Sequence, residues 1–254
     1  MLAQHPVVRN TILGSLLPED LASLRPHLRL VQFRERTVLQ EQKRRIEHVG
    51  FVESGVVSFR RTSKDDVVEL ALVGSNGIVG ATRLLGGYES SHQCITIASG
   101  ALFSIPADTL LDLIEERHRI REHLYRHVQM LFVLCSQVAL CGLHHGLTER
   151  LASWLCNASD TVGGMEIPVT HDYLSTILGL RRPSVTEALI QLEDDGLIVK
   201  TRGALRVQNR ALLQAKACGC HSTIADASGV PAAAHQSYRQ RGASVSPKRV
   251  GERI

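Results

Sequence analysis

The sequence has little of what marks several protein classes. Its six cysteines in 254 residues are too few to staple a secreted domain, and no basic segment followed by an apolar run opens the chain, so we expect no signal peptide. The longest apolar stretch, residues 130–143, is interrupted by Ser136 and Gln137 and falls short of the ~20 residues that a bilayer span needs. We therefore predict a soluble, cytoplasmic protein with no membrane partner and with reduced cysteines.

An excess of charge of one sign is also absent. The 29 Lys and Arg residues face 25 Asp and Glu residues, a net charge of +4, and apolar residues make up 44% of the chain. This composition excludes a wholly disordered or collagen-like chain. The sequence has no Gly-rich phosphate loop, nucleophile elbow or HExxH motif, so we do not expect an enzyme.

Hydrophobic periodicity divides the chain into successive parts. Residues 10–28 have helical spacing, and residues 30–105 form short alternating apolar runs separated by turn residues, which is typical of a small barrel, sandwich or roll. We predict a β-roll sensor domain over residues 1–114, a helix over 115–146, a second compact domain over 147–221 and a disordered tail over 222–254. In the second domain, residues 150–155 indicate a helix and 157–164 a loop.

The helix over residues 115–146 carries a regular apolar seam. Its members are spaced by 4, 3, 4 and 3 residues, as in a coiled coil. One interpretation is that the seam only covers the roll, and the other is that it also pairs with the same helix of a second subunit. The regularity favours a homodimer, with an interface formed by Leu124, Val128, Leu131, Cys135 and Val138.

Residues 170–194 have the spacing of a helix-turn-helix. Thr170 is a suitable N-cap, and Ser175 is followed four residues later by Gly179 and six residues after that by Val185. The small residue permits a close helix crossing, and the glycine accepts the left-handed turn. Any helical hairpin can give such a match, but the alternating runs over residues 197–207 add a hairpin wing. Five basic residues and no acid occur over residues 196–216.

The outward positions of the second helix and the wing predict contacts with double-stranded DNA. Arginine forks read guanine edges, hydroxyl groups reach phosphates, a glutamate can accept from cytosine, and basic wing residues bind the backbone. The candidate DNA-binding residues are Thr170, Arg181, Arg182, Ser184, Thr186, Glu187, Lys200, Arg202 and Arg206.

The order of roll, long helix and winged helix resembles the Crp/Fnr family of bacterial transcription regulators. Residues 51–55, 68–74 and 77–80 are similar to the roll of that family, and residues 147–155 to the helix that opens its DNA-binding domain. The resemblance implies an α+β fold with an N-terminal jelly-roll-like β-roll, a long dimerisation helix and a C-terminal winged helix-turn-helix domain. It also implies a homodimer that binds a two-fold-related DNA site and contacts RNA polymerase.

The chain departs from the cyclic-AMP-binding members of that family. Those members carry a Gly-Glu pair and, about ten residues on, an Arg-Ser or Arg-Thr pair that holds the cyclic phosphate. Here the positions hold Gly80-Ala81 and residues 90–92, Ser-Ser-His, and the alternating pattern does not place the nearby Arg83 inside the roll. We expect no cyclic AMP binding and leave the effector open. The iron–sulfur cluster of other members needs N-terminal cysteines, and the first cysteine here is Cys94.

The reading helix also departs from that of the cyclic AMP receptor, which begins Arg-Glu and has a second Arg one turn later. In this chain Arg182 keeps the first arginine, while Pro183 and Glu187 occupy the other two positions. We therefore expect a different target sequence.

Two groups of cysteine and histidine are possible metal ligands. Cys141 precedes His144 and His145, and we interpret this group as helix packing. Residues 218–221, Cys-Gly-Cys-His, are a compact trio of ligands without a partner group, which makes an incomplete zinc site. The sequence therefore predicts no metal and no cofactor.

These patterns together predict a sequence-specific, DNA-binding transcription regulator. An alternative is a sensor or protein-interaction module whose winged helix docks a protein partner. The basic run over residues 196–216 argues against that alternative, because docking a protein does not require five cations without an acid.

Overall fold

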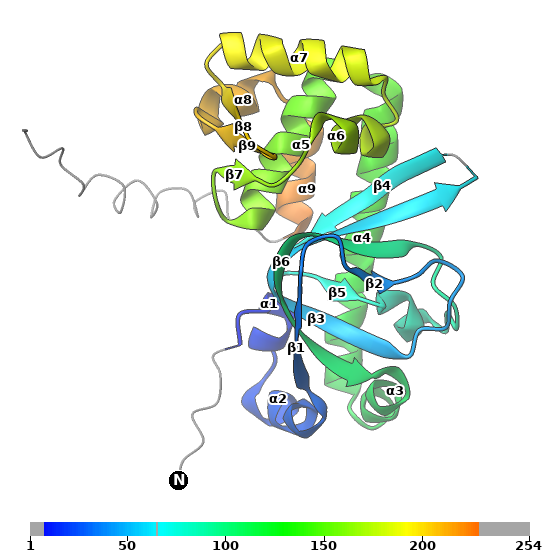
Figure 1. The fold of residues 1–254 in the computed structure, drawn as a ribbon. Helices are drawn as coiled ribbons and strands as arrows, with labels where there is room; N and C mark the ends of the chain where they lie inside the picture. The colour runs from blue at the N-terminus through cyan, green and yellow to red at the C-terminus, as the bar shows by residue number, and fades with distance from the viewer. Residues whose placement is uncertain (1–7, 65, 229–254) are drawn as a thin grey trace, which may run out of the picture.

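The computed structural model describes residues 8–64 and 66–228, and their arrangement is shown in Figure 1. A β-roll and a mostly helical domain lie one above the other, and the long helix α4 (His118–His144) runs alongside both. This is the predicted α+β architecture of a roll, a long helix and a C-terminal helix-turn-helix domain.

Short helices precede the roll, as the spacing over residues 10–28 predicts. Helix α1 (Thr11–Gly14) is capped by the Asn10 side chain, which accepts hydrogen bonds from the backbone N–H groups of Ile12 and Leu13. It is followed by α2 (Pro18–Leu24) and the 3-10 turn η1 (Arg25–His27).

The roll is an antiparallel sheet in the order β1-β6-β3-β4, with β2 paired to β6 and β5 to β3. Its strands are β1 (Arg29–Phe33), β2 (Val38–Gln40), β3 (His48–Ser63), β4 (Asp66–Val73), β5 (Ile78–Val79) and β6 (Gln93–Pro106). Several short runs expected as separate strands are thus continuous in β3 and β6, whose pairing shifts register between Val52 and Val57. The turn signal at residues 53–55 is a bulge: Gly55 has φ +82°, and a Cβ on Gly100 would lie 2.0 Å from the carbonyl oxygen of Ser54.

Two helices follow the roll where one was predicted. Helix α3 (Ala107–Glu116) is followed by the single residue Arg117, and α4 begins directly after that residue. The predicted seam lies on the inner face of α4. Leu124 and Val128 are 0% and 5% exposed and belong to the core of the roll, and Leu131 packs against that core. The structure therefore corrects the expected dimer contact for Leu124 and Val128, because the roll already covers them.

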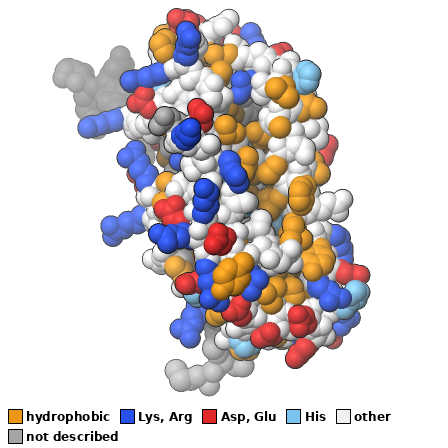
Figure 2. All heavy atoms as spheres, turned by 90° about the vertical axis from the view of Figure 1, so that its right-hand side faces the viewer, with side chains coloured by type: hydrophobic (Ala, Val, Ile, Leu, Met, Phe, Trp, Pro, Cys, Tyr) orange, Lys and Arg blue, Asp and Glu red, His pale blue; other side chains and the backbone are white. Residues whose placement is uncertain are grey.

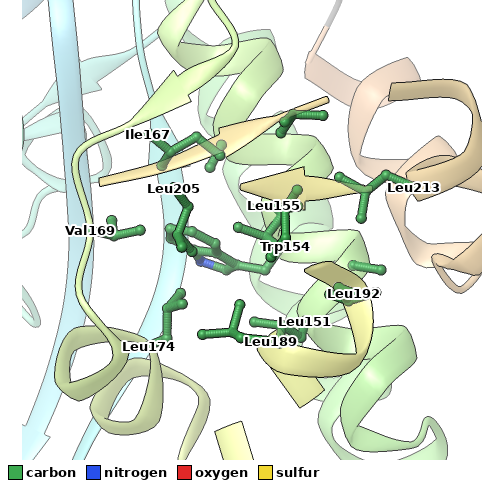
Figure 3. Packing of buried hydrophobic residues seen from close by; sticks show 14 of the residues in the cluster. Leu151, Trp154, Leu155, Ile167, Val169, Leu174, Leu189, Leu192, Leu205 and Leu213 are labelled. Atoms are coloured by element: carbon green, nitrogen blue, oxygen red, sulfur yellow. The ribbon is translucent and has the colours of Figure 1, made fainter. Parts of the chain in front are cut away.

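The C-terminal domain surrounds a core of aliphatic side chains and Trp154 (Figure 3). Its elements are α5 (Leu147–Val162), β7 (Glu166–Ile167), α6 (His171–Leu178), α7 (Arg182–Asp194), β8 (Ile198–Thr201), β9 (Ala204–Val207), α8 (Arg210–Lys216) and α9 (Cys220–Ser228). Helix α5 continues to Val162, so the loop expected from residue 157 is wrong up to that point. Strand β7 was not predicted; it pairs with β9 and makes the wing a three-stranded sheet.

The expected disordered tail is corrected at its start. Residues 222–228 belong to α9, which packs against α4 and α5. The rest of that prediction, residues 229–254, lies outside the described residues. Among the described residues, α4 is the one helix that is long and apolar enough to span a membrane by length and composition, and only 17% of its most apolar window is buried. A large apolar surface of α4 is therefore uncovered in the single chain.

Candidate nucleic-acid interface

The two helices of the predicted helix-turn-helix are α6 and α7. Thr170 caps α6, because its hydroxyl oxygen accepts a hydrogen bond from the backbone N–H of Tyr173 at 3.2 Å. Gly179 ends the helix in the left-handed conformation, with φ +62°, and Pro183 lies in the first turn of α7. The capping and turn residues identified in the sequence thus have the predicted positions.

Burial fixes which side of α7 faces outward. Val185, Leu189 and Leu192 are 0% exposed and pack into the core around Trp154. Arg181, Arg182 and Glu187 are exposed on the opposite side, and Ser184 and Thr186 are half-buried. The first turns of α7 therefore present two guanidinium groups, a carboxylate and a hydroxyl to solvent.

Arg182 is oriented by an acidic neighbour on α6. Its Nε lies 2.7 Å from Oδ1 of Asp172, and both side chains are about two-thirds exposed. Thr186 faces inward, because its hydroxyl lies 3.2 Å from Nδ1 of His171.

The basic residues of the wing are also partly paired. Lys200 Nζ lies 2.6 Å from Oε2 of Glu193, and Arg206 Nη2 lies 3.1 Å from Oε2 of Glu166. The Lys200 hydrogen bonds lower the pKa of Glu193. Arg202 is exposed at the hairpin tip, next to Gly203, which has φ +78°.

A hollow of about 320 Å³ lies between the starts of α6 and α7 and the wing. It is lined by residues 169–172, by Arg182, by Lys200 and Thr201, and by residues 203–205. The structure brings together Thr170, Arg182 and Lys200, which were predicted from separate stretches. It adds His171, which was not predicted from the sequence although it occupies the first helical position after the Thr170 cap.

A second feature joins this domain to the roll. The Glu69 carboxylate on β4 accepts hydrogen bonds from Trp154 Nε1 at 2.5 Å, from the Tyr173 hydroxyl at 3.0 Å and from the Ser58 hydroxyl at 2.5 Å. The Arg60 guanidinium lies over the Tyr173 ring, 4.8 Å from its centre. Burial raises the pKa of Glu69, outweighing the hydrogen bonds and the Arg60 charge that lower it. The sequence does not reveal this contact, because an acid in an alternating strand gives no sign that it is buried.

A cavity of about 410 Å³ lies next to Glu69, between the roll and the C-terminal domain. It is bounded by β4, α4, α5, α6 and α9. Cys135 and Val138, the last two residues of the predicted seam, line this cavity.

The part of the roll compared above with cyclic-AMP-binding proteins contains no free arginine among its described residues. Ala81 is 2% exposed, and Arg83 forms an ion pair with Asp108 at the start of α3, with 3.0 Å between Nη2 and Oδ1. His92 is buried and stacks on Phe59, with 5.0 Å between ring centres. Arg83 thus pairs with the first turn of α3.

Comparisons with known domain families agree with this architecture. A cyclic nucleotide-binding domain matches residues 30–117, and a Crp-like helix-turn-helix domain matches residues 149–216. Together the matches span more than half of the chain. None of the curated proteins matches the chain.

Solved structures share the fold at low sequence identity. The c-di-GMP-responsive global regulator CLP of Xanthomonas campestris is 18% identical with a TM-score of 0.64, over 75% of this chain and 99% of that one. FixK2 of Bradyrhizobium japonicum is 16% identical with a TM-score of 0.65, over 76% and 98%. A CRP-family transcriptional regulator of Thermus thermophilus is 17% identical with a TM-score of 0.61, over 74% and 96%.

Proposed function

Because the chain belongs to the Crp/Fnr family of transcription regulators, we propose that it is a sequence-specific DNA-binding regulator that reads a two-fold-related site as a homodimer. Helix α7 enters the major groove, and the wing binds the flanking phosphates. The reading residues are Arg181, Arg182, Ser184 and Glu187, with Thr170, Lys200, Arg202 and Arg206 on the backbone. The Thr186 hydroxyl lies 3.2 Å from Nδ1 of His171, which lines the hollow between α6 and the wing.

The observation that carries this proposal is the exposed start of α7. Its apolar side is fully used by the domain core, and its other side presents Arg181, Arg182 and Glu187 to solvent. A guanidinium group reads guanine O6 and N7 as a bidentate pair, and a carboxylate accepts from cytosine N4. The cationic wing lies beside this face, across the shared hollow. If the helix docked a protein instead, nothing would require base-reading groups and phosphate-binding groups to lie side by side.

The homodimer is supported by the uncovered face of α4. Phe132, Leu140 and Leu143 are 64%, 46% and 81% exposed and fall on one side of the helix. A band of hydrophobic side chains lies along this face of the molecule (Figure 2). Contiguous exposed apolar surface on a soluble protein marks an interaction site. We therefore propose that the dimer interface uses this outer face of α4, rather than the buried Leu124 and Val128.

The effector of this regulator is not cyclic AMP in our proposal. Ala81 replaces the acidic partner of the ribose, and Arg83 is engaged by Asp108 rather than available to a cyclic phosphate. Isothermal calorimetry with cyclic AMP is expected to show no binding heat, and a micromolar binding signal would overturn this part of the proposal.

The setting follows from family membership. We infer that the protein acts in the cytoplasm, where its DNA site and RNA polymerase are present, and that it contacts RNA polymerase at promoters. Members of the family are transcription regulators, and we propose no catalytic activity for this one.

Selection from a random-sequence duplex pool tests the proposed function. We expect enrichment of a palindromic motif whose half-sites are about 34 Å apart, or a multiple of that spacing, because a dimer presents two copies of α7 on one side of the duplex. Enrichment of a single half-site contradicts the dimer, and no enrichment contradicts DNA reading and favours the protein-docking alternative.

A further inference from the structure

Four metal-ligating side chains from distant parts of the chain meet beside the end of α4. Cys141 lies in the last turn of α4 and His145 directly follows that helix, while Cys218 lies between α8 and α9 and Cys220 is the first residue of α9. Each offers one ligand atom, and these atoms all lie within 4.8 Å of one another. We propose that this set, the Cys3His cluster, is a structural binding site for a thiophilic divalent metal ion of the Zn²⁺ class.

The ligand spacing fits tetrahedral coordination. Zn–S and Zn–N bonds of ~2.3 and ~2.0 Å place the ligand atoms of a tetrahedron roughly 3.3–3.8 Å apart. Cys141 Sγ lies 3.5 Å from Cys218 Sγ, and Cys220 Sγ lies 3.4 Å from His145 Nδ1. Only small side-chain movements are needed to close the four atoms around one ion.

The donor set identifies the class of metal. Thiolate sulfur and imidazole nitrogen suit Zn²⁺, whereas Mg²⁺ and Ca²⁺ prefer oxygen. Cys218 and Cys220 are 7% and 2% exposed, and Cys141 and His145 are half-buried. Four protein ligands in a largely buried position leave no open coordination site, which is typical of a structural rather than a catalytic zinc site.

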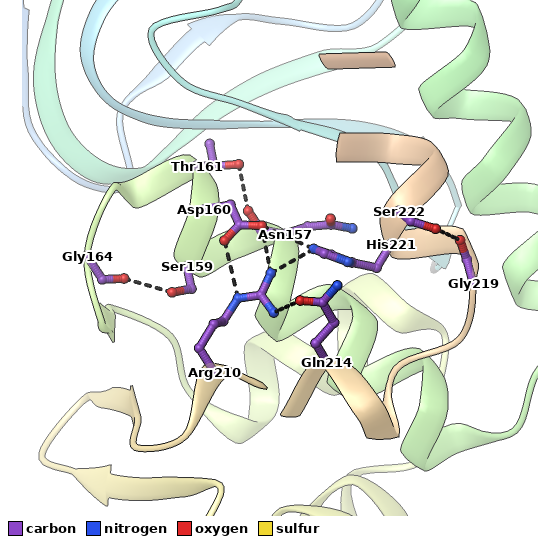
Figure 4. Close-up of polar contacts among 10 residues, drawn as sticks. All are labelled: Asn157, Ser159, Asp160, Thr161, Gly164, Arg210, Gln214, Gly219, His221 and Ser222. Atoms are coloured by element: carbon purple, nitrogen blue, oxygen red, sulfur yellow. Dashed lines mark hydrogen bonds and ion pairs between the residues drawn. The ribbon is translucent and has the colours of Figure 1, made fainter. Parts of the chain in front are cut away.

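A neighbouring network explains why His221 is not among the ligands. His221 Nε2 lies 3.1 Å from Asp160 Oδ2 and 2.8 Å from Arg210 Nη2, and Arg210 pairs with Asp160 at 2.8 Å (Figure 4). These buried contacts fix the beginning of α9. They hold Cys220 on the side that faces α4.

In the sequence, the ligands of this site are divided between two separate groups, residues 141–145 and residues 218–221. Residues 218–221 form an incomplete set, and residues 141–145 look like helix packing, because the two groups are far apart in the chain. Packing of α9 against α4 brings them together. Both halves also lie outside the matched family domains, between residues 117 and 149 and beyond residue 216. The cluster is therefore a feature of the linkage between the domains in this chain.

The position of the site suggests what the ion does. It ties α9 and the adjoining winged-helix domain to the end of α4, whose outer face we assign to the dimer. Metal binding then restrains how the DNA-binding domain is held on the long helix. The metal site itself does not depend on the proposed function, because its ligands include none of the DNA-binding residues.

Metal analysis of the full-length chain tests the proposal. After reconstitution with Zn²⁺ alone and removal of loose ions, we expect one bound zinc per chain. The Co²⁺-loaded protein is expected to show thiolate-to-cobalt charge transfer and the intense d–d bands of a tetrahedral site. The double variant Cys218→Ser/Cys220→Ser should lose the bound ion and both spectral features. Cys135→Ser removes another thiol from α4, outside the cluster, and should keep them.

A second variant keeps the test independent of folding. His145→Cys retains four ligands and should still bind one Co²⁺, with stronger charge transfer, whereas circular dichroism should be unchanged. Chelation of the wild type should increase amide hydrogen exchange in α9 and not in the roll. The proposal is overturned if the wild type retains no Zn²⁺ or Co²⁺, if the double variant binds as much as the wild type, or if Cys141 and Cys218 are joined by a disulfide in the native protein.

Discussion

At the scale of single residues, three of the side chains that we expect to contact DNA form ion pairs with acids of the same domain. Asp172 holds Arg182, Glu193 holds Lys200, and Glu166 holds Arg206. The Arg182 and Arg206 pairs are more than half exposed, and ion pairs of that kind contribute at most ~1 kcal/mol to stability. A DNA phosphate or guanine edge can therefore replace these carboxylates at low cost, and the arginine and lysine side chains are pre-oriented for the exchange.

Arg182→Ala is expected to weaken specific DNA binding. Loss of a bidentate guanine contact should cost about 1–3 kcal/mol and relax the preference at one base pair of each half-site. Fluorescence anisotropy with the selected duplex measures the affinity, and repeated selection measures the preference. Arg29→Ala, an exposed arginine on the roll, serves as the control and should change neither. If Arg182→Ala leaves affinity and motif intact, α7 is not the reading helix in the proposed register.

At the scale of elements, helix α4 has two apolar faces with different uses. The regular seam containing Leu124 and Val128 covers the roll, and the outer face with Phe132, Leu140 and Leu143 remains exposed. Periodicity identified an amphipathic helix, but it gave no measure of which apolar stripe the roll would bury. The sequence prediction included only the more regularly spaced stripe, so it described one apolar seam where the helix has two.

Phe132→Arg combined with Leu140→Arg is expected to give monomers. Two cations on the outer face of α4 repel their copies across a two-fold interface and leave charges without water. Sedimentation velocity measures the state of association. Leu30→Arg places a cation at an exposed leucine of β1 and should leave the dimer intact. A dimer that survives the double substitution would place the interface elsewhere.

The sequence predicted the elements that are determined by residues close together in the chain. The helix-turn-helix was predicted closely because Thr170, Gly179 and Pro183 act on their own neighbourhood. The continuity of β3 and β6 was not predicted, because the bulge at Gly55 depends on the strand that crosses it. The Cys3His cluster and the Glu69 contact depend on packing between distant segments, for which a single sequence carries no pattern.

At the scale of the whole molecule, Glu69 connects the β-roll to the C-terminal domain. Its carboxylate joins β4 of the roll to Trp154 on α5 and Tyr173 on α6, and α6 is the first helix of the helix-turn-helix. A change in the roll that moves β4 therefore acts directly on the element that positions α7. The adjacent cavity between the domains leaves room for such movement.

The raised pKa of Glu69 predicts a pH dependence of stability. Because burial raises its pKa above the ordinary value of 4.5, the folded protein binds this proton more tightly than the unfolded chain. Its contribution to stability is complete below the unfolded pKa and is lost as the pH rises through the folded pKa. The charged and titratable groups that face the Glu69 carboxyl are Arg60 on β3 and Tyr173 on α6.

Thermal unfolding of the Glu69→Gln variant, measured from below pH 4.5 upward, checks the prediction. The glutamine stays neutral, so the Tm of the variant relative to the wild type should increase as the pH rises above the ordinary carboxyl value of 4.5. Glu35→Gln, at an exposed loop position, should give a curve parallel to the wild type. Parallel curves for Glu69→Gln as well would mean that Glu69 does not hold the proton in the folded state.

The most direct test of DNA reading is a competition between the selected duplex and a scrambled duplex over a range of salt concentrations. We predict that the selected duplex binds at least ~10³-fold more tightly, and that the affinity for both falls steeply as salt increases, because phosphate contacts release counterions. Equal affinity for the two duplexes, or affinity that does not change with salt, would contradict a DNA-reading role for α7 and the wing.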